Sequence, residues 1–353
     1  MGALSGNQGG SRALEEAIQE IQLGPPLQRD QAYVLMEHIL RGDGTDAQIA
    51  GVLTALRTRG ETVDELVGFA EAMRAYARPI FAEGERPAAT MVDTCGTGGD
   101  GIGTFNVSTA AAFVVAGAGV LVAKHGNRSF SSRCGSADVL EALGVNLLLA
   151  PERIAEAIRS VGISFIFAPV VHTAMKHAQK ARRILKSPTV FNLLGPLTNP
   201  ARVDAQVVGV FDRRWLKPLA ETLGALGVRR AFVAHSRDGL DEVSLAEATE
   251  VAEWRDGQVL QHELNPEDFG IERQPLVDVF GDDAQTNARL IQRVLEGEQG
   301  SARDIVLLNA SLALVAADAA TDLRQGVAQA ARAIDTGEAS ARLRALVEFS
   351  NHA

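Results

Sequence analysis

The chain has 353 residues, of which 46% are apolar and 22% charged. This length exceeds what one compact core normally holds, so we expect two domains, and the composition excludes a disordered protein. The net charge of −10 disfavours nucleic acid and anionic membrane surfaces as general partners, because affinity for both comes mainly from Lys and Arg. Any anion must therefore be bound at a local site.

Cysteine content and the apolar runs indicate an intracellular protein. Cys95 and Cys134 are too few for a disulfide framework or a cysteine metal site, so both are expected to be free thiols. The N-terminal residues lack the apolar segment of a secretion signal. The longest apolar run, Ala110 to Ala123, is shorter than the roughly 20 residues that cross a bilayer. We expect a cytoplasmic location without a membrane anchor.

The first part of the chain has the apolar period of four helices, from Ala13 to about Arg78. Thr45 and Thr62 stand where helix N-caps belong, and Thr62 has Glu65 three residues later, as in a capping box. The breaks between the helices are expected at 24–26, 42–44 and 60. This pattern predicts a helical domain over residues 1–84, joined by later helices from about 172–200.

After a loop at 81–90, short β-rich runs alternate with helical ones. Strands are expected at 91–95, 120–123, 163–168, 205–211 and 230–235, and helices at 108–116, 151–161 and 213–226. This alternation predicts an α/β domain over residues 85–353, with a mostly parallel central sheet flanked by helices. An Asp-Gly turn at 256–257 predicts a late antiparallel hairpin, and the Ala-rich segment 287–349 is expected to be helical.

A glycine-rich loop follows the first predicted strand. Residues 96–103, GTGGDGIG, contain five glycines and lead into a helix expected to begin near Ser108 or Thr109. Such a loop lets a ligand approach the backbone, whose N–H groups, together with the helix N-terminus, can bind phosphate oxygens. A plain turn between strand and helix is the alternative interpretation.

Two other glycine-loop classes fit poorly. Gly96, Gly98 and Gly101 match the GxGxxG spacing of dinucleotide-binding folds, but those folds place an acidic residue at the end of the second strand to bind the ribose. No Asp or Glu occurs between Asp100 and Asp138, which counts against NAD. The glycines are not followed by the Gly-Lys-Ser/Thr of a P-loop either.

A second donor-rich loop, KHGNRSFSS at 124–132, leaves the next predicted strand and precedes a helix with Ser136 as its expected N-cap. Lys124 and Arg128 supply positive charge, and Asn127 and the serines supply neutral donors. Because loops after successive parallel strands open at the same edge of a sheet, this loop should face the glycine loop. Two such loops suit a ligand with phosphates at both ends.

The segment from Ala157 to Val203 contains no Asp or Glu. Its basic residues and histidines gather mostly on one predicted helix: His172, Lys176, His177, Lys180, Arg182, Arg183 and Lys186. A solvated basic face is one interpretation of such a run. The sharper one is a cationic wall that faces an anionic substrate.

Asp241 and Glu242 follow the strand expected at 230–235. An acidic pair in a turn often has no function. Mg²⁺, however, is typically held by one or two carboxylates together with substrate phosphates and waters. Beside two phosphate-binding loops, this pair is therefore a candidate magnesium site.

Four segments, in this order and spacing, resemble the anthranilate phosphoribosyltransferase family: GTGGDGIGTFNVST, KHGNRSFSSRCGSADVLEALG, RRILKSPTVFNLLGPLTNP and DGLDEVS. The likeness extends over nearly the whole chain and implies a fold like that of nucleoside phosphorylases. It also implies transfer of phosphoribosyl from 5-phosphoribosyl 1-pyrophosphate (PRPP) to the amine of anthranilate, the second step of tryptophan biosynthesis. Two Mg²⁺ ions per subunit and a homodimer are expected on the same ground.

The resemblance implies a role for individual positions. The residues implied in PRPP binding are Gly96, Gly99, Asp100, Thr104, Asn106, Val107, Ser108, Thr109, Lys124, His125, Gly126, Asn127, Arg128, Ser129, Phe130, Ser131, Ser132 and Ser136. The metals would be bound by Ser108, Asp241 and Glu242. Gly96, Asn127 and Arg182 would bind anthranilate, with His125 at its border. No catalytic residue is assigned, and His125 is the candidate general base.

The chain departs from the family pattern at two places, and two other functions stay open. His172-Thr173-Ala174 lacks the Pro that often follows this histidine, and Glu247 stands where small residues are common. A nucleoside phosphorylase of related fold is one alternative. A relative that binds nucleic acid is the other, which the net charge and the acidic pair disfavour. His235 and the two cysteines are expected to have no catalytic role.

Overall fold

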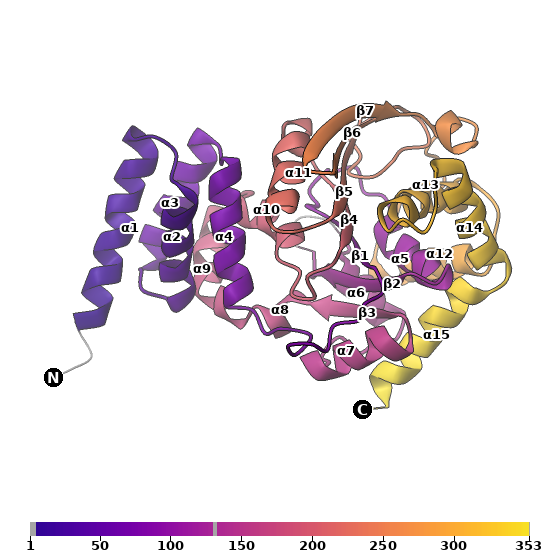
Figure 1. Cartoon of the computed structure of the whole chain (residues 1–353), viewed down its shortest axis with the longest axis horizontal. Helices are drawn as coiled ribbons and strands as arrows, with labels where there is room; N and C mark the ends of the chain where they lie inside the picture. The colour runs from indigo at the N-terminus through magenta and orange to yellow at the C-terminus, as the bar shows by residue number, and fades with distance from the viewer. Residues whose placement is uncertain (1–4, 130–132, 353) are drawn as a thin grey trace. The chain divides into compact units, whose positions relative to one another are not determined.

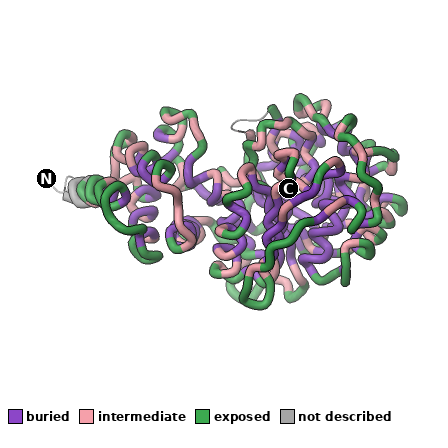
Figure 2. The backbone as a smooth tube through the Cα atoms, turned by 90° about the horizontal axis from the view of Figure 1, so that it is seen from above, coloured by how far each residue is buried: buried purple, intermediate pink, exposed green. Residues whose placement is uncertain are grey.

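The structure, a computed structural model, describes residues 5–129 and 133–352, and side chains from residue 12 onward. The chain divides into two compact units, Met1–Arg78 with Val171–Pro200, and Pro79–Val170 with Ala201–Ala353. Each unit buries an apolar core of its own (Figure 2). Among the described residues, no helix is both long enough and apolar enough to span a membrane.

The first unit is all helical. Its elements are α1 (Ser5–Leu23), α2 (Arg29–Arg41), α3 (Asp46–Arg59), α4 (Val63–Ala75), η1 (Thr173–Met175), α9 (Lys176–Leu185) and α10 (Val190–Leu197). The four expected N-terminal helices are confirmed, but α1 begins at Ser5 and not at Ala13. Thr45 and Thr62 cap α3 and α4, since their side chains accept hydrogen bonds from the N–H groups of Gln48 and Glu65. These caps fix where the helices begin.

A sheet of seven strands forms the centre of the second unit. The strands are β1 (Met91–Gly96), β2 (Leu121–Gly126), β3 (Ile163–Phe167), β4 (Ala205–Gly209), β5 (Arg230–Ser236), β6 (Thr249–Arg255) and β7 (Gln258–Leu264). Their order is β3-β2-β1-β4-β5-β6-β7. The strands β1 to β5 are parallel, and β5, β6 and β7 pair antiparallel. The predicted parallel sheet and the hairpin at the Asp-Gly turn are confirmed.

Helices cover both faces of this sheet. The remaining helices of the chain are α5 (Val107–Gly117), α6 (Ser136–Ala142), α7 (Pro151–Ser160), α8 (Ala168–Val171), α11 (Leu216–Ala225), α12 (Ala284–Leu295), α13 (Ser301–Ala316), α14 (Leu323–Asp335) and α15 (Glu338–Asn351), with the short turns η2 (Arg213–Trp215) and η3 (Pro266–Phe269). One face carries α5 and α13, and α11 packs on β5 and β6 from the other (Figure 1). The Ala-rich end of the chain is helical, as expected.

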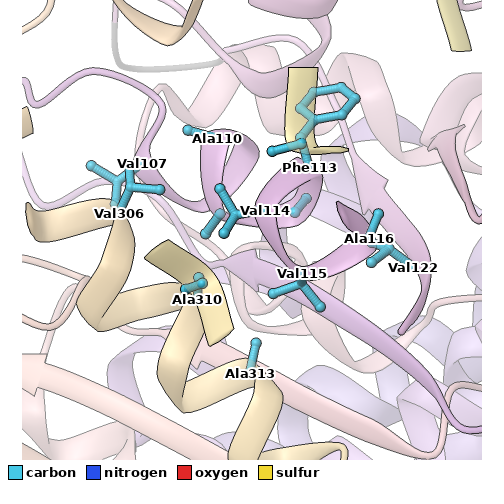
Figure 3. Close-up of a cluster of buried hydrophobic side chains, with 14 of the residues drawn as sticks. Val107, Ala110, Phe113, Val114, Val115, Ala116, Val122, Val306, Ala310 and Ala313 are labelled. Atoms are coloured by element: carbon cyan, nitrogen blue, oxygen red, sulfur yellow. The ribbon is translucent and has the colours of Figure 1, made fainter. Parts of the chain in front are cut away.

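The helix behind the glycine loop, α5, lies at the centre of the core. It is apolar on all sides, because it packs against β1 and β2 and against α13, α14 and α15. Val107, Ala110 and Val114 of α5 gather with Val306 and Ala310 of α13 (Figure 3). A helix buried in this way gives the loop in front of it a rigid support.

The strand order places a switch point between β1 and β4. From β1 the chain proceeds to β2 and β3 on one side, whereas β4 and β5 lie on the other. In open α/β sheets, ligands bind outside the carboxyl ends of the strands at such a point. The glycine loop leaves β1 at this position, so the topology by itself marks this edge of the sheet as the candidate site.

Candidate functional site

Three segments that are distant in sequence meet at the carboxyl edge of the sheet. The backbone N–H of Ser108, in the first turn of α5, donates to Glu242 Oε1 at 3.1 Å. Lys124 Nζ, from β2, donates to the carbonyl oxygen of Thr94 and, at 3.4 Å, to Ser108 Oγ. A Cβ on Gly96 would lie 3.1 Å from Asp241 Oδ2. The end of β1, the start of α5, Lys124 of β2 and the acidic pair therefore lie together at this edge of the sheet.

The glycine loop runs from Gly96 to the start of α5. Gly98 and Gly99 have φ of 60° and 90°, a region that residues with a side chain rarely adopt. The far end of the loop pairs with the segment before α12, because the N–H of Gly281 donates to Gly103 O at 2.9 Å. Thr104 forms a bridge with Phe280 in the same place. The loop is thus fixed at both ends and exposes its glycines between them.

The structure corrects three local expectations. The second strand extends to Gly126, so Lys124 and His125 belong to β2 and are 3% and 6% exposed, not loop residues. The helix α5 begins at Val107, one residue before the expected start, and Thr109 is buried in its first turn. The N-cap of α6 is Gly135, and Ser136 is the first helical residue. Each difference arises because pairing with β3 and local packing extend the elements beyond their sequence signals.

Lys124 is a buried cation beneath the site. Loss of water around its ammonium group lowers the pKa of Lys124, while attraction to Asp93, Cys95 and Glu242 opposes this effect. Its hydrogen bond to Ser108 Oγ ties β2 to the N-terminus of α5. The lysine therefore contributes positive charge from below, close to the helix end and to the acidic pair.

The acidic pair is held close to β1 and β4. Gly209 is the last residue of β4, and a Cβ at this position would lie only 1.5 Å from the carbonyl oxygen of Asp241. The lack of a side chain therefore lets Asp241 approach β4 closely. From the other side, Asn309 of α13 accepts from the N–H of Val243 at 2.9 Å and donates to its carbonyl oxygen at 3.1 Å. These two hydrogen bonds fix the backbone of Val243, directly after Glu242. The carboxylates are consequently presented by a rigid turn.

The charge state of this pair suits a divalent cation. Burial, with repulsion from Asp100 as the next cause, raises the pKa of Asp241 to about 7. Burial and repulsion from Asp241 raise the pKa of Glu242 to about 8. Asp100 Oδ2 is buried and has no hydrogen-bond partner among the described residues. Three crowded carboxyl groups gain stability when a cation neutralises them.

A magnesium site of this kind is shared with its ligand. The described residues contain no group of three or more His, Cys, Asp or Glu that could hold an ion by themselves. Mg²⁺ does not need such a group, because it binds to one or two carboxylates and completes its shell with phosphate oxygens and waters. The oxygen set of Asp241, Glu242 and Ser108, beside the glycine loop, fits this ion.

The loop after β2 is organised by Asp138 of α6. Its carboxylate accepts from the N–H groups of Ser129 at 3.1 Å and Gly135 at 2.9 Å, and pairs with Arg128 at 2.9 Å. Arg128 is also bound by Glu141, so its guanidinium is engaged within this loop. Asn127 is exposed at the start of the loop. Phe130, Ser131 and Ser132 lie outside the described residues.

Gly126 and Ser136 bring the two ends of this loop together. A Cβ on Gly126 would lie 2.3 Å from Ser136 Oγ, which itself donates to Asn127 O at 3.4 Å. Only glycine therefore allows the end of β2 to approach the first turn of α6. Both residues determine the conformation of the loop, in which Asn127 is the first residue after β2.

The basic helix α9 belongs to the first unit and contains two kinds of residue. Lys180 is exposed and pairs with Asp46 at 2.6 Å, which is typical of a solvated surface. Arg182 is half-buried, and its guanidinium lies 5.2 Å from the ring centroid of Phe191. Burial lowers the pKa of Arg182. Arg182 therefore differs from its neighbours as a cation that is partly shielded from water.

Some residues that shape the site have no motif that would reveal them. Asp93, within β1, is buried and accepts from the N–H of His125 at 3.2 Å. A charged residue in an otherwise apolar strand is the one signal that could have drawn attention to it. Gly209 and Asn309 carry no such signal, because their roles depend on Asp241 and Val243, which are distant in sequence.

The cysteines and His235 have no catalytic setting. Cys95 and Cys134 form no disulfide, as expected, and both are buried. Burial raises the pKa of Cys134 to about 11 and that of Cys95 well above its ordinary value, so neither is a thiolate at neutral pH. His235 Nδ1 forms a hydrogen bond with Val210 O at 2.8 Å. The chemistry of the site therefore lies in its anion donors and its carboxylates.

Comparisons with known proteins agree with this geometry. Residues 88–340 match the family model described as "Glycosyl transferase family, a/b domain", and residues 15–77 match "Glycosyl transferase family, helical bundle domain". An anthranilate phosphoribosyltransferase of Symbiobacterium thermophilum is 50% identical over 338 residues, which cover 96% of this chain and 98% of the relative. One from Solibacter usitatus is 53% identical, covering 90% of this chain and 93% of the relative.

Solved structures give the same result. The anthranilate phosphoribosyltransferase of Thermus thermophilus superposes with a TM-score of 0.88 at 44% identity, covering 95% of this chain and 99% of that one. The enzyme of Saccharomyces cerevisiae in complex with PRPP and Mg gives a TM-score of 0.87 at 27% identity, covering 97% and 99%. With half of its residues shared over nearly its whole length, this chain belongs to the anthranilate phosphoribosyltransferases of the glycosyl transferase family.

Proposed function

We propose that the protein transfers the phosphoribosyl group of PRPP to the amine of anthranilate, which yields N-(5-phosphoribosyl)anthranilate and pyrophosphate. The observation that carries this proposal is the contact between the phosphate loop and the acidic pair, where Ser108 N–H meets Glu242 Oε1 at 3.1 Å. A phosphate-binding helix end beside carboxylates needs a ligand that brings both phosphate and a metal ion. PRPP bound with Mg²⁺ has this composition.

The donor would occupy the edge of the sheet between the two loops. In this proposal, Lys124 and backbone N–H groups of 96–109 bind the pyrophosphate, and the loop that follows β2 binds the 5-phosphate end. The exposed glycines and Asn127 support this arrangement. Arg128 would take part only by exchanging its present partners, Asp138 and Glu141.

Asp241, Glu242 and Ser108 would hold the magnesium, with two ions per subunit as the family resemblance implies. The metal would supply positive charge to the pyrophosphate as it leaves. The relative from S. cerevisiae that was solved with PRPP and Mg supports the choice of ion. Asp100 lies close enough to Asp241 to raise its pKa, so it is a further carboxylate beside this magnesium site.

Catalysis by this site rests on electrostatics and positioning. When the bond from ribose C1 to pyrophosphate breaks, negative charge develops on the leaving group, and Lys124 with the N–H groups of the loop stabilises it. Holding the amine close to C1 can contribute roughly 7 to 11 kcal/mol at best. The aromatic amine is neutral at pH 7, so no strong base is required. His125, buried beside the site, is the candidate to receive the proton.

The acceptor would be recognised by its carboxylate. We assign Arg182 to this group and Gly96 and Asn127 to the aromatic amine. A guanidinium partly shielded from water binds a carboxylate strongly, and the pKa of Arg182 is lowered by this shielding. A complex of the S. cerevisiae relative with 4-fluoroanthranilate supports an aminobenzoate as acceptor.

Three further assignments belong to the same proposal. The protein acts as a homodimer in the cytoplasm, in the second step of tryptophan biosynthesis. Its functional domains are residues 1–84, joined by helices from about 172–200, and residues 85–353. The compact units and the matched ranges 15–77 and 88–340 support this division.

The test is a direct assay. Protein, Mg²⁺, PRPP and anthranilate are mixed, and the loss of anthranilate fluorescence is followed. The matched variant is Asp241→Asn with Glu242→Gln, which keeps size and removes charge. We expect rapid loss of fluorescence with the unmodified protein and none with the variant. An inactive unmodified protein would refute the function, and a fully active variant would refute the metal assignment.

A further inference from the structure

Asn287 lies outside every segment by which the sequence indicates the site. It is in the first turn of α12 and is 2% exposed. Its Oδ1 accepts from the N–H of Asp282 at 2.9 Å, and its Nδ2 donates to Asn106 Oδ1 at 3.1 Å. Asn106 is the last residue of the glycine loop, directly before α5. A buried amide from a distant helix is thus joined to the phosphate loop.

These hydrogen bonds determine which way both amides face. A backbone N–H can only donate, so the atom of Asn287 that meets Asp282 must be its oxygen. Its NH₂ group then faces Asn106 and requires an oxygen there. The NH₂ group of Asn106 consequently faces Cys134 O at 3.3 Å, a carbonyl that can only accept. The N–H of Asp282 at one end and the carbonyl oxygen of Cys134 at the other therefore require the same orientation of the two amides.

This orientation matters for an anion. With one hydrogen of Asn106 Nδ2 directed at Cys134 O, the second remains available to donate to a phosphate oxygen. The opposite orientation would present Asn106 Oδ1, which repels a phosphate. The amide also does not cap its own helix, because its Oδ1 is occupied by Asn287 and by the Cys134 thiol at 3.4 Å. The Asn106 side chain therefore does not itself occupy the N-terminus of α5, where the Ser108 N–H donates to Glu242 Oε1.

The packing around Asn287 leaves little room for another arrangement. A Cβ on Gly281 would lie 2.5 Å from Asn287 Oδ1 and 2.8 Å from Phe105 Cα. The backbone of this segment is also paired with the loop, since Phe105 N–H donates to Val279 O at 2.9 Å. The contact of Asn287 with the glycine loop is thus buried and closely packed.

We propose that Asn287 is a positioning residue for the donor substrate, which orients the Asn106 amide so that its NH₂ group faces the phosphates of PRPP. This inference rests on the proposed function. It assigns Asn287 no contact with the substrate and no part in the chemistry. Its effect is on the binding of PRPP and not on the binding of anthranilate.

The test is Asn287→Asp, which has the same shape and, as an ionised carboxylate, cannot donate to Asn106. The variant carboxylate still accepts from Asp282, and Asn106 must turn its oxygen toward the anion. A hydrogen bond to a charged group is worth roughly ten- to one-hundred-fold in affinity. We expect the KM for PRPP to rise by about tenfold or more, with the KM for anthranilate unchanged. Calorimetric titration with PRPP and Mg²⁺ should show the same loss.

Two controls separate positioning from general damage. Asp283→Ala removes the cap of the same helix, which accepts from Thr286 N–H at 2.7 Å, and should lower the melting temperature without changing the KM for PRPP. In an Asn106→Ala background, Asn287→Asp should add no further rise, because its effect passes through Asn106. Should Asn287→Asp fail to fold by circular dichroism, Asn287→Ser, whose hydroxyl is too short to reach Asn106, replaces it with the same expectation.

The outcomes distinguish this inference from the proposed function. An unmodified protein that does not consume anthranilate would refute the function itself. An active protein whose Asn287→Asp and Asn287→Ser variants keep the KM for PRPP would overturn the inference alone. Equal rises in both KM values, or full additivity with Asn106→Ala, would also overturn it.

Discussion

A methyl group at Gly209 should disable the site while the fold remains. The new Cβ would lie 1.5 Å from the carbonyl oxygen of Asp241 and 2.6 Å from its carbonyl carbon. An ordinary non-bonded contact needs about 3.5 Å, so the acidic turn must retreat by roughly 2 Å. The obstacle is backbone, which cannot rotate away as a side chain can. Gly209→Ala therefore moves the turn that carries both carboxylates away from the end of β4.

The kinetic effect follows from the size of this movement. Mg²⁺ requires ligand distances of about 2.0–2.1 Å, and a misplacement of about 1 Å can cost roughly 100-fold in rate. We expect kcat/KM for PRPP to fall by at least about 100-fold in the anthranilate fluorescence assay. Overpacking of this kind costs about 1–3 kcal/mol, so the melting temperature should fall by only a few degrees. Mg²⁺ should no longer raise the melting temperature of the variant.

Gly224→Ala is the matched control. Its Cβ would lie 2.0 Å from Trp254 Cε2, where α11 packs on β6, and no residue of the acidic turn is among its nearest contacts. This variant should lose stability to a similar extent and retain kcat/KM. If both variants lost activity in proportion to their stability, or if Gly209→Ala kept its magnesium-dependent activity, the reasoning from the close approach would be wrong.

Four more outcomes are expected. Arg182→Ala should raise the KM for anthranilate about tenfold or more and leave that for PRPP unchanged; an equal rise in both would remove Arg182 from the acceptor site. The raised pKa values of Asp241 and Glu242, about 7 and 8, mean that the metal-free fold loses stability as pH rises toward 8, because these carboxyls ionise more readily when unfolded. Mg²⁺ must displace their protons, so its affinity, measured by calorimetry, should increase from pH 6 to 9, and a flat profile would contradict this. Glu65→Gln removes the fully buried partner of Arg59 and should cost about 3 kcal/mol in urea unfolding, a value near zero being inconsistent with this ion pair.

The type and order of the helices and strands were predictable, because the residues that indicate them are close together in sequence. Thr45 and Thr62 mark helix starts through their own side chains, and the Asp-Gly turn at 256–257 marks the hairpin. The ends of elements were less predictable. β2 continues through Lys124 and His125 because pairing with β3 outweighs the polarity of these residues. Two polar residues at the end of a strand predict a loop, and only the position of the neighbouring strand shows that they continue the strand.

The candidate site also has parts that were predictable from the sequence and parts that were not. The glycine loop, the loop after β2 and the acidic pair could be predicted, because each carries its chemistry within a few consecutive residues. Asn287 and Gly209 could not, because their importance lies in single atoms of residues far along the chain, Asn106 Oδ1 and Asp241 O. An isolated asparagine or glycine has no local pattern that reveals such a partner.

The amino-acid sequence by itself determined the alternation of strands and helices, the donor-rich composition of two loops and the presence of an acidic pair. Local propensity and residue chemistry suffice for these features. Only the tertiary structure decided that Lys124 is buried, that Arg128 is bound by Asp138 and Glu141, and that Asp241 lies against Gly96. Burial, charge pairing and close approach depend on which surfaces meet when the sheet assembles, and that information is distributed over the whole chain.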